Sequence, residues 1–352
     1  MIKMVDLLSF EKEELVSLLK DLSEPTFRGK QIFSWLHKGV DFQGMKNLPK
    51  ALTEKLANNY IANPVKILEK YTSKIDGTIK LLYLLPDNNI IEGVLMKYKY
   101  GNTLCVSTQV GCRMGCKFCA SCLDGLIRNL TAGEILGQIV AVNSMLGGDI
   151  NNRMVTNVVL MGSGEPLDNY DNVTKFFRLL EDKDGLNISM RNISLSTSGL
   201  CDKIYRLADE GYHITLTISL HSSDNQYRSS IMPVNNKYPI EDLIKAARYY
   251  FDKTGRRVIF EYCMIEGVTD SSEQAKKLAE LTKGFPTHIN LIRLNKVKER
   301  DLNRASEDSI QNFLHILEKN GASATIRRTL GSDIDGACGQ LRRKYLSGGQ
   351  NH

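Results

Sequence analysis

Strand-like and helical segments alternate along the chain from residue 102 onward, and this pattern restricts the possible fold more than any other feature. The strand-like segments are rich in Val, Ile, Leu and Thr, and amphipathic segments of helical length separate them. Such alternation favours parallel strands joined by right-handed helical crossovers. We therefore predict an α/β fold, a partial open barrel of six βα units, with a doubly wound sheet as the alternative. The predicted strands are 103–108, 155–161, 192–197, 214–220, 258–265 and 289–294, followed by a further strand at 323–328.

The residues before this alternation predict an accessory module. Ser9 precedes glutamates at 11, 13 and 14, so we expect it to cap the first of several amphipathic helices. Two strand-like segments, 78–85 and 90–98, flank a Pro-Asp-Asn-Asn turn and predict a β-hairpin. The expected organisation is a helical accessory domain at 1–62, a β-hairpin extension at 63–100, the α/β core with a C-terminal cysteine loop at 101–341, and a polar tail at 342–352.

Three cysteines stand close together after the first predicted strand of the core: Cys112, Cys116 and Cys119, spaced C-x3-C-x2-C. Structural zinc sites and electron-transfer clusters have four protein ligands, whereas a four-iron cluster on three thiolates leaves one iron open to a further ligand. The triplet favours such an open cluster. Cys122 follows at the next x2 step, so a four-cysteine zinc site and a closed cluster remain alternatives, together with a disulfide pair.

Composition narrows the class of protein. The chain has 352 residues, of which 42% are hydrophobic and 24% charged, as in globular proteins with a large core. We find no apolar run of membrane-spanning length, and the acidic, amphipathic N-terminal segment lacks a signal-peptide pattern. Eight cysteines in such a chain indicate the reducing cytoplasm, where clustered thiols serve metal or redox chemistry. The net charge of +6 is compatible with a nucleic-acid partner but does not demand one.

Glycines and polar residues gather where the predicted strands end: at 162–166 after the second strand, 196–199 at the third, 219–222 at the fourth, and Asn295 after the sixth. In a parallel barrel these ends meet at one rim, where reactive residues lie. Each position also has a plainer interpretation, such as turn glycines, a buried histidine at 221 or a helix cap at 196. Glycines let a ligand approach the backbone closely, and Glu165 could hold a cationic amine there.

The cysteine triplet, with Phe118 before its last cysteine, resembles the radical S-adenosylmethionine (SAM) superfamily, and Gly162-Ser-Gly164-Glu165 resembles the motif that binds the methionine amine there. Longer strings resemble the RNA adenine C2 methyltransferases over nearly the whole chain: Leu104–Cys112, Met161–Pro166, Ser196–Gly199, Ser219–His221, Ile231–Pro233, His288–Ile292 and Asp333–Gln340. The resemblance implies a barrel of the radical SAM type and a [4Fe–4S] cluster on Cys112, Cys116 and Cys119. The implied SAM contacts are Gly164, Glu165, Ser196, Ser219, Leu220, His221 and Asn295.

The same resemblance implies covalent chemistry by two distant cysteines. Cys338 would take a methyl group from one SAM, and a radical made from a second SAM would activate that methyl for addition to adenine. Glu92 would accept the C2 proton, and Cys105 would release the product by forming a disulfide with Cys338. Without the resemblance, Cys338 is a loop cysteine, Cys105 a small buried hydrophobe and Glu92 a surface carboxylate on an edge strand. Cys122, Cys201 and Cys263 match no family role and are interpreted as structural.

The implied substrates are one adenosine of large-subunit rRNA and the adenosine 3′ of the anticodon in some tRNAs, with the helical module recognising RNA. We expect a monomeric, cytoplasmic enzyme without membrane contact that needs a flavodoxin- or ferredoxin-like reductant. Arg293 replaces a proline common in the C2 methyltransferases and matches resistance enzymes that methylate adenine C8, so C8 methylation of rRNA remains an alternative. A zinc-containing RNA-binding protein without catalysis is the alternative from another class.

Overall fold

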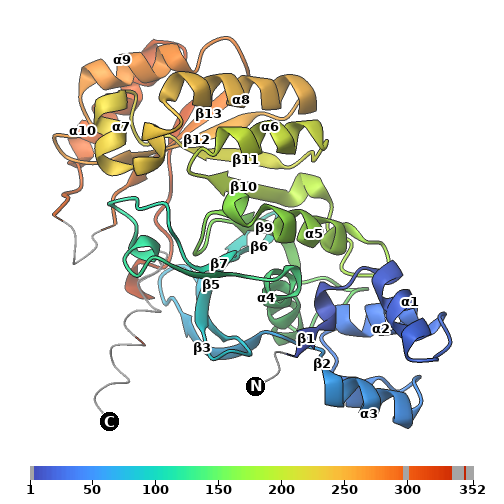
Figure 1. The fold of residues 1–352 in the computed structure, drawn as a ribbon. Coiled ribbons are helices and arrows are strands. Elements are labelled where there is room, and N and C mark those ends of the chain that lie inside the picture. The colour runs from blue at the N-terminus through green and yellow to red at the C-terminus, as the bar shows by residue number, and fades with distance from the viewer. Residues whose placement is uncertain (1–3, 296–300, 335–344, 346–352) are drawn as a thin grey trace.

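A ten-stranded sheet forms the centre of the protein, seen here in a computed structural model that describes residues 4–295, 301–334 and 345 (Figure 1). The strand order is β14-β13-β12-β11-β10-β9-β6-β5-β4-β3. Neighbouring strands from β6 to β14 run parallel, which confirms the predicted α/β fold. The parallel strands are β6 (Gly101–Cys105), β9 (Val155–Leu160), β10 (Ile193–Thr197), β11 (Thr215–Ser219), β12 (Val258–Met264), β13 (Thr287–Arg293) and β14 (Ala324–Ile326).

The predicted hairpin is part of a larger antiparallel extension of this sheet. It contains β3 (Lys66–Thr72), β4 (Ile79–Leu84) and β5 (Ile90–Tyr98), and β5 pairs with β6 of the core. The sequence prediction missed β3 because this edge strand is largely exposed and does not show a buried apolar face. The extension and the core are therefore continuous through one ladder of hydrogen bonds.

The sheet curves around an interior cavity, as a barrel does. Side chains from β5, β6 and β9 through β13 line one cavity of about 340 Å³, among them Thr103, Asn157, Thr217 and Asn290. Since residues from so many neighbouring strands face one space, the sheet is rolled rather than flat. This geometry agrees with the predicted partial barrel and not with a doubly wound sheet.

Helices follow the parallel strands in the predicted order. They are α4 (Ala132–Met145), α5 (Tyr170–Glu181), α6 (Cys201–Asp209), α8 (Ile240–Thr254), α9 (Ser272–Leu281) and α10 (Glu307–Lys319), and a short extra helix, α7 (Asn225–Ile231), follows β11. α5 shows why these segments are helical, since Val173, Phe176, Phe177 and Leu180 recur at helical spacing and are buried. Burying each such side chain contributes roughly 1.5–3 kcal/mol to folding.

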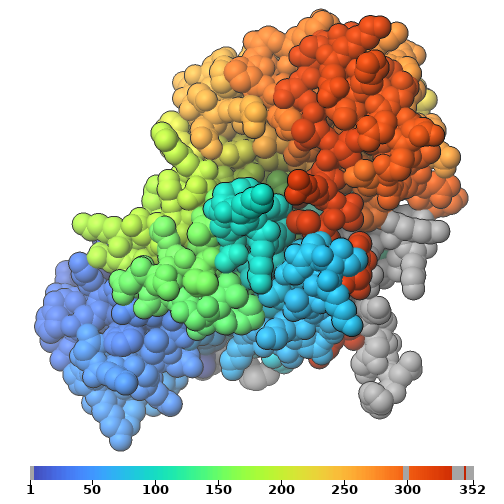
Figure 2. Space-filling model, turned by 180° about the vertical axis from the view of Figure 1, so that it is seen from behind, coloured from blue at the N-terminus to red at the C-terminus, as the bar shows by residue number. Residues whose placement is uncertain are grey.

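The N-terminal helices α1 (Lys12–Asp21), α2 (Arg28–His37) and α3 (Lys50–Asn59) form a lobe beside the core (Figure 2). The remaining described elements are short. Two small sheets pair β1 (Val5–Asp6) with β2 (Tyr60–Ile61) and β7 (Gln109–Gly111) with β8 (Leu126–Asn129). Single turns of 3-10 helix lie at Leu7–Ser9, Phe42–Gly44, Ala120–Cys122, Pro166–Asn169, Met190–Asn192, Pro233–Asn236 and Ser332–Ile334. Among the described helices, none is both long and apolar enough to cross a bilayer.

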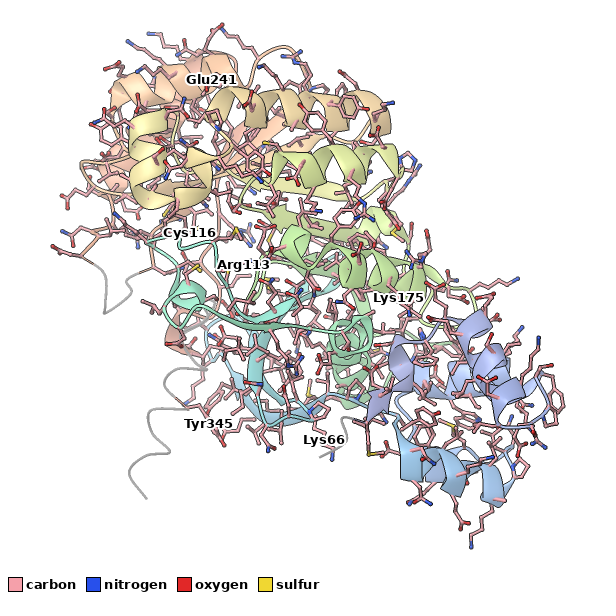
Figure 3. All side chains as sticks on the ribbon, viewed as in Figure 1. Lys66, Arg113, Cys116, Lys175, Glu241 and Tyr345 are labelled. Carbon is pink, nitrogen blue, oxygen red and sulfur yellow. The ribbon has the colours of Figure 1, made fainter. Side chains whose placement is uncertain are left out.

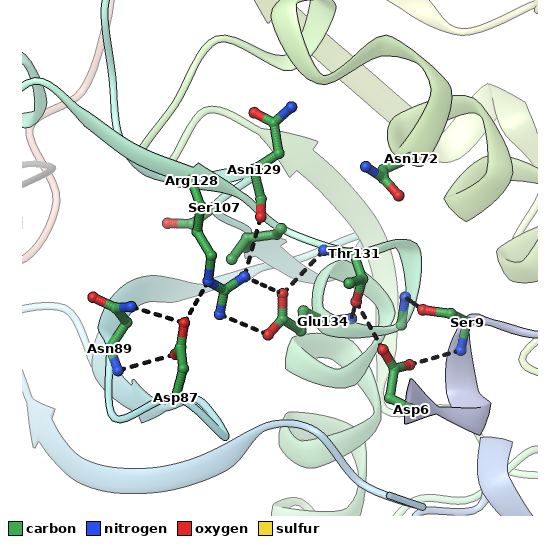
Figure 4. A network of polar contacts seen from close by, with 12 residues as sticks. Asp6, Ser9, Asp87, Asn89, Ser107, Arg128, Asn129, Thr131, Glu134 and Asn172 are labelled. Carbon is green, nitrogen blue, oxygen red and sulfur yellow. Dashed lines mark hydrogen bonds and ion pairs between the residues drawn. The ribbon is translucent and has the colours of Figure 1, made fainter. Parts of the chain in front are cut away.

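A polar network attaches this lobe to the core (Figure 4). The Thr131 hydroxyl donates to Asp6 (3.0 Å), and Ser9 Oγ accepts from the backbone N–H of Gly133 at the start of α4 (2.7 Å). The predicted capping role of Ser9 is therefore wrong: α1 begins after Glu11, and Ser9 serves the N-terminus of α4 instead. A serine near the start of a helix is usually read as the cap of that helix, because Ser is preferred at N-caps. Its spacing along the chain does not show that it caps a helix more than a hundred residues away.

Candidate active site at the strand ends

The cysteine loop begins after β7 and is fixed at both of its sides. The backbone N–H of Cys112 donates to Gly125 (2.9 Å), and that of Lys117 donates to Ile231 at the end of α7 (2.9 Å). Cys116 is buried in an apolar cluster with Ile231 and Met232, which lie at and just after the end of α7. Figure 3 shows Cys116 and Arg113 on this loop below α7. The loop is thus held between the small β7–β8 sheet and the end of α7.

Four thiols converge on this loop. The thiols of Cys112, Cys116 and Cys119 lie near enough to that of Cys122 for hydrogen bonding among them to shift thiol pKa values. This hydrogen bonding lowers the pKa of Cys122, and together with burial it raises the pKa of Cys112 and Cys116. The predicted triplet is therefore brought together, and Cys122 lies with it rather than apart from it.

The donor set suits a thiolate-bound cluster. Iron–sulfur clusters are held by cysteine thiolates inside a largely apolar shell, and here Met232, Ile265 and Leu294 provide such a shell. In the described part of the chain no group of three or more His, Cys, Asp or Glu side chains is preset at metal-ligand geometry. The fit consequently rests on the type, number and burial of the thiols.

The glycine-rich segment after β9 lies tightly against the segment after β6. The backbone N–H of Ser163 donates to Ser107 Oγ (2.9 Å), and that of Glu165 donates to Gln109 Oε1 (2.8 Å). Gly164 has φ of 110°, and a Cβ there would lie 2.7 Å from the backbone nitrogen of Gln109. Only glycine fits this position, so the residue is required for the shape of the site whether or not a ligand is bound.

Glu165 is buried at this junction. One carboxylate oxygen accepts from the backbone N–H of Ser198 after β10 (2.6 Å), and the other accepts from that of Leu167 (3.1 Å). Burial raises the pKa of Glu165, and these hydrogen bonds oppose the rise. The carboxylate thereby joins the ends of β9 and β10, and it can accept from an amine on the same site.

The other predicted SAM contacts also lie at strand ends. Ser196 and Ser219 are half-buried in the last residues of β10 and β11, Leu220 and His221 are buried directly after β11, and Asn295 is exposed just after β13. The His221 ring packs edge-on against Phe118 of the cysteine loop, with ring centroids 4.7 Å apart. Its Nδ1 accepts from the backbone N–H of Cys263 (3.1 Å), and burial lowers its pKa to about 3, so the ring is neutral.

Glu92 and Cys105 lie on the same face of the sheet. Cys105 at the end of β6 is directly opposite Val94 of β5, and Glu92 is two residues from Val94, so both side chains project into the interior. Both are buried. Glu92 forms an ion pair with Lys80 of β4, Oε2 to Nζ 3.5 Å, and both side chains are almost completely inaccessible. Glu92 is therefore not the surface carboxylate of an edge strand that its local sequence alone suggests.

Polar side chains line the interior cavity of the barrel. Glu261 on β12 accepts from Asn290 Nδ2 (2.9 Å) and forms an ion pair with Arg327 (3.3 Å). Ser194 and Thr217 hydroxyls are 3.2 Å apart on neighbouring strands. Cys338, the other predicted catalytic cysteine, lies outside the described residues.

Comparison with known proteins supports one family. Residues 106–279 match the model described as "Radical SAM superfamily", and residues 5–61 match "Ribosomal RNA large subunit methyltransferase N-terminal domain". The "Probable dual-specificity RNA methyltransferase RlmN" of Clostridium beijerinckii is 51% identical over 345 residues, which cover 98% of this chain and 96% of the relative. Its namesake from Clostridium novyi is also 51% identical, over 97% of this chain and 99% of its own length. The chain belongs to the RlmN family of radical SAM methyltransferases.

The fold agrees with this membership. The crystal structure of a radical SAM methyltransferase from Sphaerobacter thermophilus matches with a TM-score of 0.90 and 42% identity, over 96% of this chain and 98% of that one. As a radical SAM methyltransferase of the RlmN family, the protein uses a [4Fe–4S] cluster and SAM, as predicted. The non-catalytic zinc protein is thereby excluded.

Sequence reasoning missed two buried cations at this RlmN-family site. Lys80 is the one charged residue in the otherwise apolar strand β4, and it lies on the same face as Glu92. A charged residue inside such an apolar run could have indicated a buried ion pair. Arg228 of α7 had no comparable signal, because it stands in a short polar helix whose burial depends on distant segments.

Proposed function

We propose that this RlmN-family enzyme methylates C2 of one adenosine in large-subunit rRNA and of the adenosine 3′ of the anticodon in some tRNAs. The observation that carries the proposal is that relatives named dual-specificity RNA methyltransferases match nearly the whole chain, including its N-terminal ribosomal RNA module. Adenine C2 is not nucleophilic, so it cannot take a methyl group by simple displacement. The cluster and SAM, when bound, supply the radical chemistry that this carbon requires.

In this proposal Cys112, Cys116 and Cys119 hold the cluster. Their convergence in an apolar shell supports the assignment. SAM contacts come from the strand ends, at Gly164, Glu165, Ser196, Ser219, Leu220, His221 and Asn295. The buried Glu165 carboxylate, beside a glycine that admits close approach, supports a role in binding the methionine amine.

The covalent work falls to residues on the inner face of the sheet and in the C-terminal loop. Cys338 carries the methyl group as S-methylcysteine and becomes linked to RNA, Glu92 accepts the C2 proton, and Cys105 attacks Cys338 to release the product. The shared face of Glu92 and Cys105 supports their acting on one bound base. Release leaves a Cys105–Cys338 disulfide, so a reductant must restore both thiols.

Arg293, the residue that departs from the C2 pattern, makes contacts within the protein. Its guanidinium forms two hydrogen bonds with the Glu307 carboxylate on α10, each 2.9 Å, and also donates to the backbone oxygen of Arg327. Arg293 thus binds α10 through Glu307. We therefore interpret the departure as structural.

Further parts of the proposal concern the cellular setting. We propose a cytoplasmic monomer that draws electrons from a flavodoxin- or ferredoxin-like reductant for the cluster and the disulfide. Residues 1–62 serve as the RNA-recognition domain, 63–100 as a β extension, 101–341 as the catalytic core and 342–352 as a polar tail. The target adenine must be unstacked to reach the interior thiols.

Nucleoside mass spectrometry tests the proposal. Reconstituted enzyme, SAM and reductant are incubated with an rRNA fragment and with tRNA, and the digest is compared with C2- and C8-methyladenosine standards. We expect only C2-methyladenosine. Cys338→Ala should lose both RNA methylation and the added methyl on the intact protein, whereas Cys201→Ala, a buried cysteine of α6, should retain both. C8-methyladenosine as the product would refute methylation at C2. RNA methylation by Cys338→Ala would refute the S-methylcysteine route.

A further inference from the structure

Arg228 is a completely buried guanidinium whose N–H groups all meet uncharged oxygens. Its Nε donates to Leu220 O (2.9 Å). One terminal nitrogen donates to Asn235 Oδ1 (2.8 Å) and Tyr238 O (3.4 Å), and the other to Ser198 O (2.7 Å) and Ser219 O (3.2 Å). The five donors of the guanidinium are thereby satisfied. Within the described residues, however, no carboxylate pairs with its charge.

An unpaired buried cation is costly, because burial removes hydration that neutral carbonyl groups only partly replace. Burial lowers the pKa of Arg228 to about 10, while charge attraction to Cys116 opposes the fall. The side chain therefore stays protonated at neutral pH. A fixed positive charge in such a place is best explained by an anion that binds beside it.

The location of Arg228 points to the iron–sulfur cluster as that anion. Its α7 helix ends at Ile231, whose carbonyl accepts from Lys117 of the cysteine loop and whose side chain packs with Cys116. On the other side, Ser198 accepts from Arg228 through its carbonyl and donates through its N–H to Glu165. Arg228 therefore lies between the thiol group and the strand ends that are proposed to bind SAM.

We propose that Arg228 is a positioning residue that fixes these strand ends for SAM and supplies a buried positive charge to the iron–sulfur cluster. A cluster on three thiolates is an anion, and one-electron reduction makes it more negative. A nearby buried cation stabilises the reduced form more than the oxidised form, since charge effects are strong where water is excluded. Arg228 should thus raise the reduction potential of the cluster. The proposal rests on the proposed cysteine ligands.

Two substitutions in the full chain separate the charge from the hydrogen bonds. Arg228→Gln removes the charge and most donors, and Arg228→Lys keeps the charge but loses the planar fork. Each protein is reconstituted anaerobically, analysed for iron and sulfide, and titrated electrochemically with EPR detection, and its SAM affinity is measured. We expect full clusters in both, a more negative midpoint potential in Arg228→Gln, and a potential close to wild type in Arg228→Lys. Both should bind SAM about tenfold more weakly or worse.

Arg153→Gln is the matched control, because Arg153 also donates to backbone carbonyls, those of Leu186 and Asn187, but in a loop away from the cysteines. Arg153→Gln should change neither the midpoint potential of the cluster nor the SAM affinity. A folded, cluster-loaded Arg228→Gln with wild-type potential and SAM affinity would overturn the proposal. If that variant does not fold, undiminished SAM affinity in Arg228→Lys overturns it. Absence of the cluster from the unaltered chain would instead contradict the cysteine ligands.

Discussion

At the residue scale, the thiols of the cysteine loop lead to the sharpest prediction. Cys112→Ala, Cys116→Ala and Cys119→Ala should each prevent cluster assembly, whereas Cys122→Ala should leave it intact. The reason is that three thiolates leave the iron site that SAM needs, although Cys122 lies within the same thiol group. The measurement is iron and sulfide per chain after anaerobic reconstitution, with the visible absorption of the cluster.

Cys263→Ala provides the control, since Cys263 is buried in β12 and belongs to the apolar wall of the site. Its iron content should equal that of the unaltered protein. Loss of iron on replacing Cys122 would make this residue a ligand. The closed four-cysteine cluster would then replace the open one.

The buried pair of Lys80 and Glu92 makes a prediction about stability. Lys80→Met should lower the free energy of unfolding by about 3–5 kcal/mol, because it removes a cation that is paired with the buried Glu92 carboxylate. The double variant Lys80→Met, Glu92→Gln should recover part of this loss, since the side chain at position 92 is then neutral. Urea unfolding of the three proteins measures the effect.

The exposed pair of Lys50 and Glu54 is the comparison, with side chains that are 89% and 60% accessible. Lys50→Met should cost less than about 1 kcal/mol. A loss that small for Lys80→Met would mean that the Glu92 carboxylate is stabilised chiefly by other groups.

At the scale of elements, the site depends on how closely the segments after β6 and β9 approach. Gly164→Ala should disrupt this junction, because the added Cβ would lie 2.6 Å from Gln109 Cβ and φ of 110° disfavours any side chain. We expect a loss well above about 1 kcal/mol in the free energy of unfolding, with weaker SAM binding by calorimetry. Urea unfolding of the same protein gives the first quantity.

Gly211→Ala is the control for a positive φ without a close contact, since Gly211 has φ of 72° and no atom lies within 4 Å of the point that an added Cβ would occupy. It should cost about 1 kcal/mol and leave SAM binding unchanged. Equal effects of the two substitutions would show that strain, and not the close approach of the segments, explains the need for glycine.

At the scale of the whole molecule, the N-terminal lobe is attached through a buried histidine. His37 of α2 accepts through Nδ1 from the backbone N–H of Leu186 in the core (3.3 Å), and its ring packs at a tilt against Phe33. Burial lowers its pKa from 6.5 to about 3, an effect that Asp182 opposes and Lys12 reinforces. The neutral ring is therefore part of the contact between lobe and core.

The sign of the pH dependence follows from this shift. Because the folded pKa is below the unfolded one, the stabilisation is complete above about pH 6.5 and is lost as pH falls from 6.5 towards 3. His37→Gln should flatten the decline in unfolding free energy over this range by up to about 1.4 kcal/mol per pH unit. An unchanged slope in denaturant titrations at several pH values would contradict a neutral, buried His37.

Much of the architecture was predictable from the sequence because the signals are local. Thr131 and Glu134, three residues apart, form a capping box at the start of α4, and the predicted apolar strands of the core become β6 and β9 to β13. The cysteine spacing and the strand-end motifs indicated the family and its cofactors, which the relatives confirm. The roles of individual site residues stay predictions.

The sequence by itself therefore determined the order of elements, the family and the chemistry that its thiols can support, since each depends on neighbours along the chain. Only the tertiary structure decided that Lys80 faces Glu92, that Ser9 caps α4, and that Arg228 of α7 binds the strand ends. Burial and pairing of charges depend on which distant segments meet, and that is a property of the packed chain rather than of local residue patterns.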